Sequence, residues 1–369
     1  MRDTIRVLHG ADLHLDSPFE ALPEEKAAVR RQEQREMLLT IARLAGERRA
    51  DLVLLAGDLL DTGSAYRETA RTLCDALGQI KAPVFIAPGN HDYYAPRSPW
   101  ARLELPENVH VFRSAAVCSV ALPALGAEVF GAAFTDETAP PLLADFEPPE
   151  NPENRLRLLC IHGEMGPGAA RYNPVTEAEL ARSGMDYVAL GHSHTYSGLR
   201  RAGEVYYAWP GCAEGRGFDE TGDKGVLLLE VGHGRCEAEF VPIAGRKYHR
   251  LDVDLTGAAD AAAAVLAALP ERAARDIFKI TLRGRVQAPP TLEALQQALS
   301  DKVFALRLRD ETRPDADIWA GMEEDTLRGL FLRLLREKFD AAGTDREKQT
   351  ALLAVRYGLA AMDNAEEPR

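Results

Sequence analysis

Apolar runs of strand length that stop at polar residues recur along the first part of the chain. Residues 5–12, 51–58 and 82–92 form three such runs, and residues 23–49 and 65–80 between them carry helical patterns. The first helical segment is acidic at its start and basic at its end, as the helix dipole prefers. Strands that alternate with helices predict a sheet with crossover helices, whose ligands gather beyond the carboxyl ends of the strands.

The alternation resumes after a proline-rich stretch at residues 146–154. Two apolar runs that stop at a histidine come next, followed by two strands around a glycine-rich loop and by one further strand; these segments occupy residues 155–164, 186–196, 203–231 and 236–243. They complete a first domain, which we expect to comprise residues 1–245.

The rest of the chain predicts a small α+β unit at residues 246–315 and a helical segment at residues 316–369. The α+β unit has three expected strands and two expected helices, at residues 247–255, 277–284, 302–310, 258–269 and 291–299. The helical segment has patterns at residues 323–339 and 346–362. In the first of these, apolar residues recur at three- and four-residue steps and form one stripe: Leu327, Leu330, Phe331, Leu334, Leu335 and Phe339.

Composition narrows the class of protein. The 369 residues exceed one compact core, and 46% hydrophobic residues suffice for a sizeable interior. The net charge of −13 argues against a generally basic nucleic-acid binder but leaves room for a local cationic site made by metal ions. The five cysteines show no metal or disulfide spacing. With neither a long apolar run nor a signal-peptide pattern, we expect a cytoplasmic protein without a membrane partner.

Metal-ligating residue types stand just past the predicted strands. A lone His or Asp at a strand end is usually a cap or a turn former, but eight such residues together predict a site: Asp12, His14, Asp58, Asn90, His91, His162, His192 and His194. Carboxylate, imidazole and amide groups together suit manganese, iron or zinc. In D-x-H and H-x-H, alternate residues of an extended segment point the same way, so both side chains can face one ion. Asp58 is the candidate bridge between two ions.

These motifs resemble a known family. D-x-H, G-D-x-x-D, G-N-H-D, a lone His and G-H-x-H, in this order, are similar to the calcineurin-like metallophosphoesterases over residues 5–245. "HGADLHLDSPF", "DYVALGHSH" and "WPGCAEGRGFDETGDKG" resemble the DNA repair exonuclease branch typified by SbcD, and "LHLDSPF" its YhaO-like subgroup. The resemblance implies two manganese ions on a four-layered α/β/β/α sandwich, a small α+β capping domain, a helical C-terminal tail that holds an SMC-like ATPase, and a homodimer.

The resemblance also implies roles for the individual residues. One ion is expected at Asp12, His14, Asp58 and His194, and the other at Asp58, Asn90, His162 and His192. A water between the ions would supply the hydroxide nucleophile. His91 would protonate the leaving sugar oxygen or stabilise the transition state.

Five neighbouring residues have two interpretations each. Asp92 either orients the His91 ring or caps the following turn, and Asp61 is expected to hold a histidine rather than an ion. Arg216 either makes a forked contact to a phosphate or is an ordinary arginine of a hairpin turn. Tyr93 and Tyr94 either stack on an unpaired base or lie buried under the loop.

Three functions remain open at this point. The first is a manganese-dependent DNA nuclease, expected from the resemblance to trim ends in the 3′ to 5′ direction. The second is a phosphodiesterase or phosphatase acting on nucleotides or phosphoproteins, because the metal ligands recognise only a phosphate ester. The third is a non-catalytic scaffold that binds DNA or an ATPase. The apolar stripe from Leu327 to Phe339 either docks on the chain's own capping domain or receives an SbcC-like partner.

Overall fold

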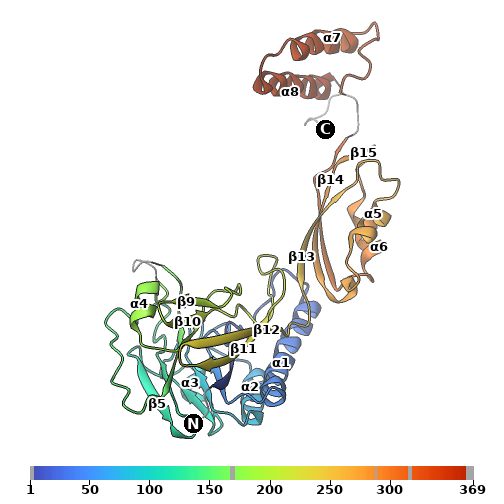
Figure 1. Cartoon of the computed structure of the whole chain (residues 1–369). Helices are drawn as coiled ribbons and strands as arrows, with labels where there is room; N and C mark the ends of the chain where they lie inside the picture. The colour runs from blue at the N-terminus through green and yellow to red at the C-terminus, as the bar shows by residue number, and fades with distance from the viewer. Residues whose placement is uncertain (1–3, 167–170, 287–288, 315–317, 363–369) are drawn as a thin grey trace. The chain divides into compact units, whose positions relative to one another are not determined.

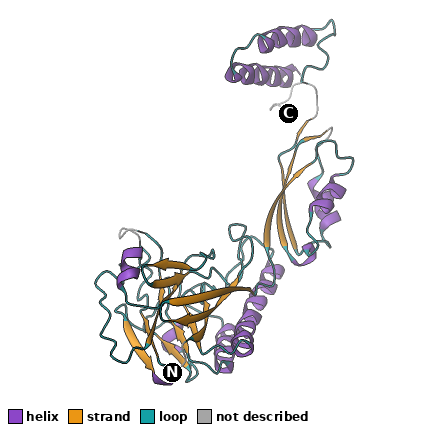
Figure 2. Cartoon of the chain, in the orientation of Figure 1, coloured by secondary structure: helices purple, strands orange, loops and turns teal. Residues whose placement is uncertain are grey.

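The computed structural model describes residues 4–166, 171–286, 289–314 and 318–362. The chain divides into two compact units, drawn in Figures 1 and 2. The first consists of residues 1–249 with 275–277, and the second of residues 250–274 with 278–369.

The first unit contains two six-stranded sheets. The first sheet has the strand order β12-β11-β1-β2-β3-β4, with β1 (Ile5–Gly10), β2 (Leu52–Leu55), β3 (Val84–Ile86), β4 (Val109–Val111), β11 (Gly225–Gly232) and β12 (Arg235–Pro242). The second has the order β5-β6-β7-β8-β10-β9, with β5 (Cys118–Leu122), β6 (Ala127–Gly131), β7 (Leu156–His162), β8 (Tyr187–Gly191), β9 (Arg200–Ala202) and β10 (Val205–Ala208). Strands β1 to β4 are parallel to one another, as are β6, β7 and β8.

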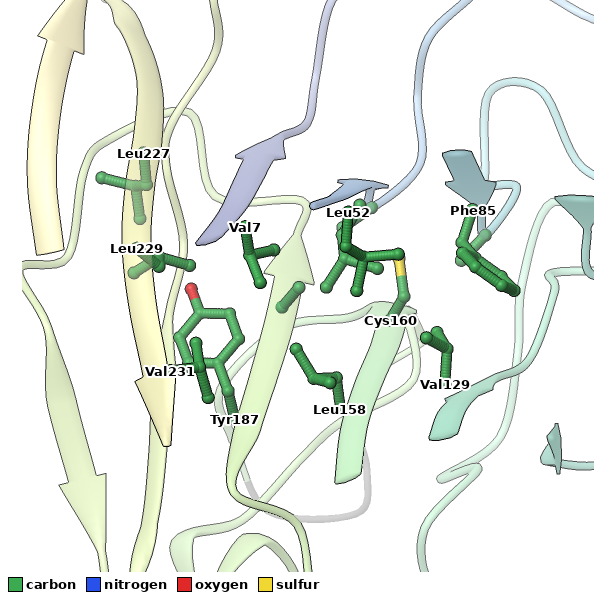
Figure 3. Close-up of a cluster of buried hydrophobic side chains, with 14 of the residues drawn as sticks. Val7, Leu52, Phe85, Val129, Leu158, Cys160, Tyr187, Leu227, Leu229 and Val231 are labelled. Atoms are coloured by element: carbon green, nitrogen blue, oxygen red, sulfur yellow. The ribbon is translucent and has the colours of Figure 1, made fainter. Parts of the chain in front are cut away.

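The two sheets pack face to face through alternate residues of their strands. Leu52 and Leu54 of β2 enter the core between the sheets, while Val53 and Leu55 enter the core on the outer face. Leu158 of β7 enters the same inter-sheet core from the opposite side, as Figure 3 shows. Because successive side chains of a strand point to opposite faces, continuous apolar runs are what strands buried on both faces require.

Helices cover the outer faces of both sheets (Figure 2). The helices α1 (Glu24–Glu47) and α2 (Arg67–Gln79) bury Leu38 and Leu73 against the first sheet. On the second sheet, α4 (Glu177–Arg182) buries Leu180. The short helix α3 (Pro99–Arg102) buries Trp100 in the same cluster as α1 and α2. The predicted α/β/β/α sandwich is therefore confirmed.

The second unit contains the predicted three strands and two helices. A three-stranded sheet has the order β13-β14-β16, with β13 (Tyr248–Asp254), β14 (Ile277–Arg283) and β16 (Ala305–Asp310). The helices α5 (Ala261–Ala268) and α6 (Leu292–Leu299) share a core with this sheet, and β15 (Arg285–Val286) pairs with β17 (Arg313–Pro314). The helical segment contains α7 (Leu327–Asp340) and α8 (Asp345–Met362), so the predicted helical end of the chain is also confirmed. The polar tail lies outside the described residues.

Candidate metal centre

The strand ends of the two sheets meet at one edge of the sandwich. Asp58 follows β2, Asn90 follows β3, and His162 is the last residue of β7. The His162 imidazole lies across the gap between the sheets, with Nδ1 2.9 Å from the carbonyl oxygen of Ala56. The sheets approach so closely here that a Cβ on Gly191 would overlap that carbonyl oxygen. Glycine at this position therefore permits the convergence.

Four of the candidate ligands have an unusual backbone. The φ angles of Asp12, His14, Asp58 and His192 are 52°, 44°, 51° and 97°. Residues other than glycine rarely occupy this left-handed region, and such residues gather at functional sites. Backbone hydrogen bonds hold the turn, since the N–H groups of Asp12 and His14 donate to the carbonyl oxygens of Gly57 and Asp58 at 3.0 and 2.9 Å.

This backbone corrects the argument that D-x-H and H-x-H are extended segments. Asp12 and His14 do lie together, but through consecutive turns rather than through strand alternation. His192 and His194 lie in different groups: His192 Nδ1 is 3.3 Å from Asn90 Oδ1, whereas His194 Nε2 is 3.1 Å from His14 Nε2. The left-handed φ of His192 breaks the alternation that would direct both rings to one ion.

The first group of ligands consists of Asp12, His14 and His194, whose ligand atoms lie within 4.8 Å of one another. The Nδ1 atoms of the two histidines face carboxylates, Asp61 Oδ1 at 3.1 Å and Glu220 Oε1 at 2.7 Å. A carboxylate at Nδ1 keeps the proton there and leaves a lone pair on Nε2. The two Nε2 atoms lie 3.1 Å apart, and when both carry a lone pair they repel each other unless a cation binds both. The group therefore fits a divalent ion.

The second group contains Asn90, His162 and His192. Because His162 Nδ1–H donates to the Ala56 carbonyl oxygen, Nε2 faces Asn90 Oδ1 at 3.1 Å and Asp58 Oδ2 at 3.4 Å. Asn90 Oδ1 also lies 3.3 Å from His192 Nδ1, and this set of oxygen and nitrogen donors fits a cation too. Asp58 Oδ2 is in addition 3.8 Å from His14 Nε2, so the Asp58 carboxylate stands between the two groups.

Burial and mutual charge shape the titration of these ligands. Burial raises the pKa of Asp12, and burial lowers the pKa of His192 to about 4, which keeps this imidazole neutral at pH 7. Although burial alone would raise the pKa of Asp58 and lower that of His162, their attraction dominates. The pKa of Asp58 falls below its usual range, and that of His162 rises to about 9. A divalent ion would replace the His162 proton as the counter-charge of Asp58.

His91 differs from the ligands in being exposed. Its backbone N–H donates to Asp58 Oδ1 at 2.9 Å, and its ring Nδ1 lies 2.9 Å from the carbonyl oxygen of Asp61. One of its nitrogens lies within 4.8 Å of ligand atoms of His14 and Asp58. The ring thus stands at the open side of the site, with Nδ1–H directed to a carbonyl and Nε2 as the nitrogen available for proton exchange.

The contacts of Asp92 support the turn-capping interpretation. This residue is fully buried, and its carboxylate accepts hydrogen bonds from the N–H groups of Gly89, Leu59 and Leu60 at 2.8, 2.8 and 3.2 Å. Burial and the nearby Asp58 charge raise the pKa of Asp92 to about 7. Asp92 thereby connects the loop after β3 to the loop after β2. A catalytic role for Asp92 stays a prediction.

Arg216 has contacts that neither interpretation from the sequence foresaw. Its guanidinium is 19% exposed and binds Asp61 Oδ1 at 3.0 Å and Glu220 Oε1 at 2.9 Å. The fork expected for a phosphate is therefore occupied by two carboxylates, and phosphate binding by Arg216 stays a prediction. Asp61 holds a histidine, as expected. The sequence analysis did not predict a role for Glu220. Its acidic side chain in the same glycine-rich loop as Arg216 could have marked it as a partner of a metal-ligating histidine.

The tyrosines of the loop after β3 differ in burial. Tyr94 packs against the cores on both faces of the first sheet, whereas Tyr93 is half-buried, and base stacking by Tyr93 stays a prediction. The sequence analysis did not consider Tyr172, whose ring centroid lies 5.1 Å from that of His192.

Comparison with known proteins places this site in a class. The family model described as calcineurin-like phosphoesterase matches residues 5–196. The chain belongs to this family of phosphoesterase hydrolases, and the resemblance stated from the sequence is confirmed at that level.

Individual relatives extend the likeness. The chain is 30% identical over 356 residues to the uncharacterized metallophosphoesterase YhaO of Bacillus subtilis, with 86% of this chain and 84% of that protein covered. It is 28% identical over 235 residues to the DNA double-strand break repair protein Mre11 of Methanosarcina mazei, with 62% of this chain and 36% of that protein covered. A solved dimetal phosphatase from Danio rerio matches at 11% identity and a TM-score of 0.42, over 64% of this chain and 99% of its own.

No helix within the described ranges combines the length and the apolar character that crossing a bilayer requires.

Proposed function

We propose that the protein is a metal-dependent DNA nuclease of the SbcD-type branch, which hydrolyses phosphodiester bonds and trims ends in the 3′ to 5′ direction. The observation that carries the proposal is the convergence of two ligand groups on Asp58, with two imidazole Nε2 atoms 3.1 Å apart. The naming of the Methanosarcina mazei relative as a double-strand break repair protein supports DNA as the substrate. Manganese is the ion expected, and a homodimer the expected assembly.

The residues divide the work between holding ions and moving a proton. Asp12, His14, Asp58 and His194 would hold one divalent ion, and Asp58, Asn90, His162 and His192 the other. When bound, such a pair supplies a hydroxide nucleophile at neutral pH and stabilises the charge on the phosphate. His91, with Nδ1–H fixed by the Asp61 carbonyl oxygen, would give the Nε2 proton to the leaving sugar oxygen.

The proposal is tested by digestion of linear, circular and single-stranded DNA with and without manganese. Linear DNA should be shortened from its ends only when the ion is present, because the proposed nucleophile is a hydroxide that forms from water on the bound ions. If the protein leaves all DNA intact but hydrolyses a nucleotide diester, it is a phosphodiesterase. If it hydrolyses no ester while binding DNA, it is a scaffold.

We also propose that α7 binds an SbcC-like ATPase. The stripe predicted from the sequence is divided in the structure: Phe331 packs against Gly358 of α8, whereas Leu327, Leu330 and Leu334 are 75%, 48% and 53% exposed. Exposed leucines on one helix favour a partner helix in the helix-in-groove manner.

Substitution of both Leu330 and Leu334 by Glu should remove ATPase binding and leave hydrolysis of a small test ester unchanged, because two charges would be desolvated in the interface. Co-purification with the ATPase and an ester assay measure the two effects. Leu353→Glu, at an equally exposed position of α8, serves as the control. If the double substitution leaves ATPase binding intact, the partner binds another surface. If binding is lost only when the chain is truncated after Asp317, that surface lies elsewhere in the C-terminal helical segment.

A further inference from the structure

The two ligand groups are oriented by different kinds of partner. In the first group, carboxylates face the Nδ1 atoms of both His14 and His194. In the second, His162 Nδ1 faces a backbone carbonyl, which the fold of β2 holds in place, and His192 uses Nδ1 itself to face Asn90. Both histidines of the first group therefore face side chains that must themselves be held in position, whereas in the second group the described contacts give only His192 a carboxylate outside the ligand set, Glu164 at 3.9 Å from its Nε2.

One arginine connects those two carboxylates. Arg216 Nη1 lies 3.0 Å from the Asp61 oxygen that faces His14, and Arg216 Nη2 lies 2.9 Å from the Glu220 oxygen that faces His194. The Arg216 backbone N–H donates to the other Glu220 oxygen at 2.7 Å. The guanidinium is thus the centre of a chain from one ligand histidine to the other.

The loop that carries Arg216 is anchored from below. Glu214, two residues earlier, is 1% exposed and pairs at 2.5 Å with Arg30 of α1, which is fully buried. The second carboxylate oxygen of Glu214 accepts a hydrogen bond from the N–H of Gly245 at 3.1 Å. Breaking one partner of such a buried pair is costly, so the backbone at Arg216 has little freedom to move.

We propose that Arg216 is a positioning residue that supports the first metal ion and not the second. It holds Asp61 and Glu220 so that they orient His14 and His194, and its Nη2 also lies 3.1 Å from His194 Nδ1. The inference rests on the two-metal function proposed above. Its physical basis is the planar fork of arginine, which binds two carboxylates in fixed directions, whereas lysine offers a point charge.

The experiment measures manganese binding to metal-free protein by calorimetry and by electron paramagnetic resonance, which distinguishes a coupled pair of ions from a single ion. Wild type should bind two ions. Arg216→Met should weaken one of them about 10–100-fold, the usual effect of losing an outer partner of a metal ligand, and leave the other nearly unchanged. Arg216→Lys should restore part of the lost affinity. Arg201→Met, which removes an exposed arginine of β9, should behave as wild type.

Single-site backgrounds show which ion is affected. With His162→Ala, the remaining ion is that of the first group, and adding Arg216→Met should weaken it further. With His14→Ala, the remaining ion is that of the second group, and adding Arg216→Met should change nothing. This pattern separates the positioning of the first group from a general loss of structure, which would weaken both ions.

Several outcomes would overturn the inference. A folded Arg216→Met protein that binds both ions as wild type does contradicts it, and so does equal weakening of both ions. If Arg216→Met does not fold, Arg216→Lys decides in its place, and wild-type affinities or equal weakening in that variant contradict the inference. A wild type that binds fewer than two ions contradicts the proposed function as well. A wild type that binds two ions but hydrolyses no ester contradicts the proposed function alone.

Discussion

Replacement of Asp58 by Asn is expected to lower the rate of ester hydrolysis by about 10³-fold or more, because the variant loses several kcal/mol of charge stabilisation. Asp58 is 2% exposed, and its Oδ2 lies 3.4 Å from His162 Nε2 and 3.8 Å from His14 Nε2. Asp12 also has a carboxylate oxygen within 4.8 Å of ligand atoms of His14 and His194 and of Asp58 and His162. Without the shared anion, two divalent cations at the distance of such pairs, about 3.5–4 Å, repel each other.

The same substitution should preserve the fold. Asn keeps an oxygen that accepts the hydrogen bond which the His91 N–H donates to Asp58 Oδ1 at 2.9 Å. Calorimetric titration with manganese should show one ion instead of two, and the hydrolysis assay should show the loss of rate. Asp75→Asn, on the exposed side of α2, is the matched control and should change neither. Two ions bound at wild-type affinity by Asp58→Asn would exclude a bridging carboxylate.

Replacement of His91 by Ala is expected to lower kcat about 10²–10⁴-fold while both ions stay bound, which is the usual contribution of a general acid. The ring is exposed at the open side of the site, and Nδ1 is directed at the Asp61 carbonyl oxygen at 2.9 Å. The hydrogen bond from His91 to the ligand Asp58 comes from the backbone N–H, which Ala retains. The loss should therefore fall on the chemical step.

Substrates with different leaving groups test this assignment. A diester whose leaving group is a good one, such as a nitrophenolate, needs little protonation, so His91→Ala should hydrolyse it with a much smaller loss than DNA. His233→Ala, another exposed histidine, is the control. If His91→Ala loses one manganese ion, then His91 is a ligand, as its distance within 4.8 Å of His14 and Asp58 ligand atoms would permit.

The fold was predictable wherever local pattern and burial agree. The runs that became β1, β2, β3, β7 and β8 are apolar at successive positions because both of their faces are covered. Residues 99–145 received no prediction, although β4, β5 and β6 lie there. In β5 every residue is exposed or half-buried, so the strand lacks the continuous burial that marks the others.

The candidate site was predictable as a set of residues but not as a geometry. Each candidate ligand follows a buried strand, and parallel strands end at a common edge, so their proximity follows from the sequence. Asp92 shows the limit, because its hydrogen bonds go to the N–H groups of Leu59 and Leu60, more than thirty residues earlier in the chain. No local pattern specifies such a partner.

The sequence by itself determined the layered fold, the family and the eight polar residues at the strand ends. The apolar runs show which segments are buried, and the residue types at their ends show which side chains can bind a metal. The tertiary structure alone decided the backbone that presents these ligands, since left-handed residues at Asp12, His14 and His192 replace strand alternation. It also decided that Arg216 binds Asp61 and Glu220 rather than facing outward. These contacts join loops after β2 and β10, and their formation depends on how closely the two sheets approach, which no single segment encodes.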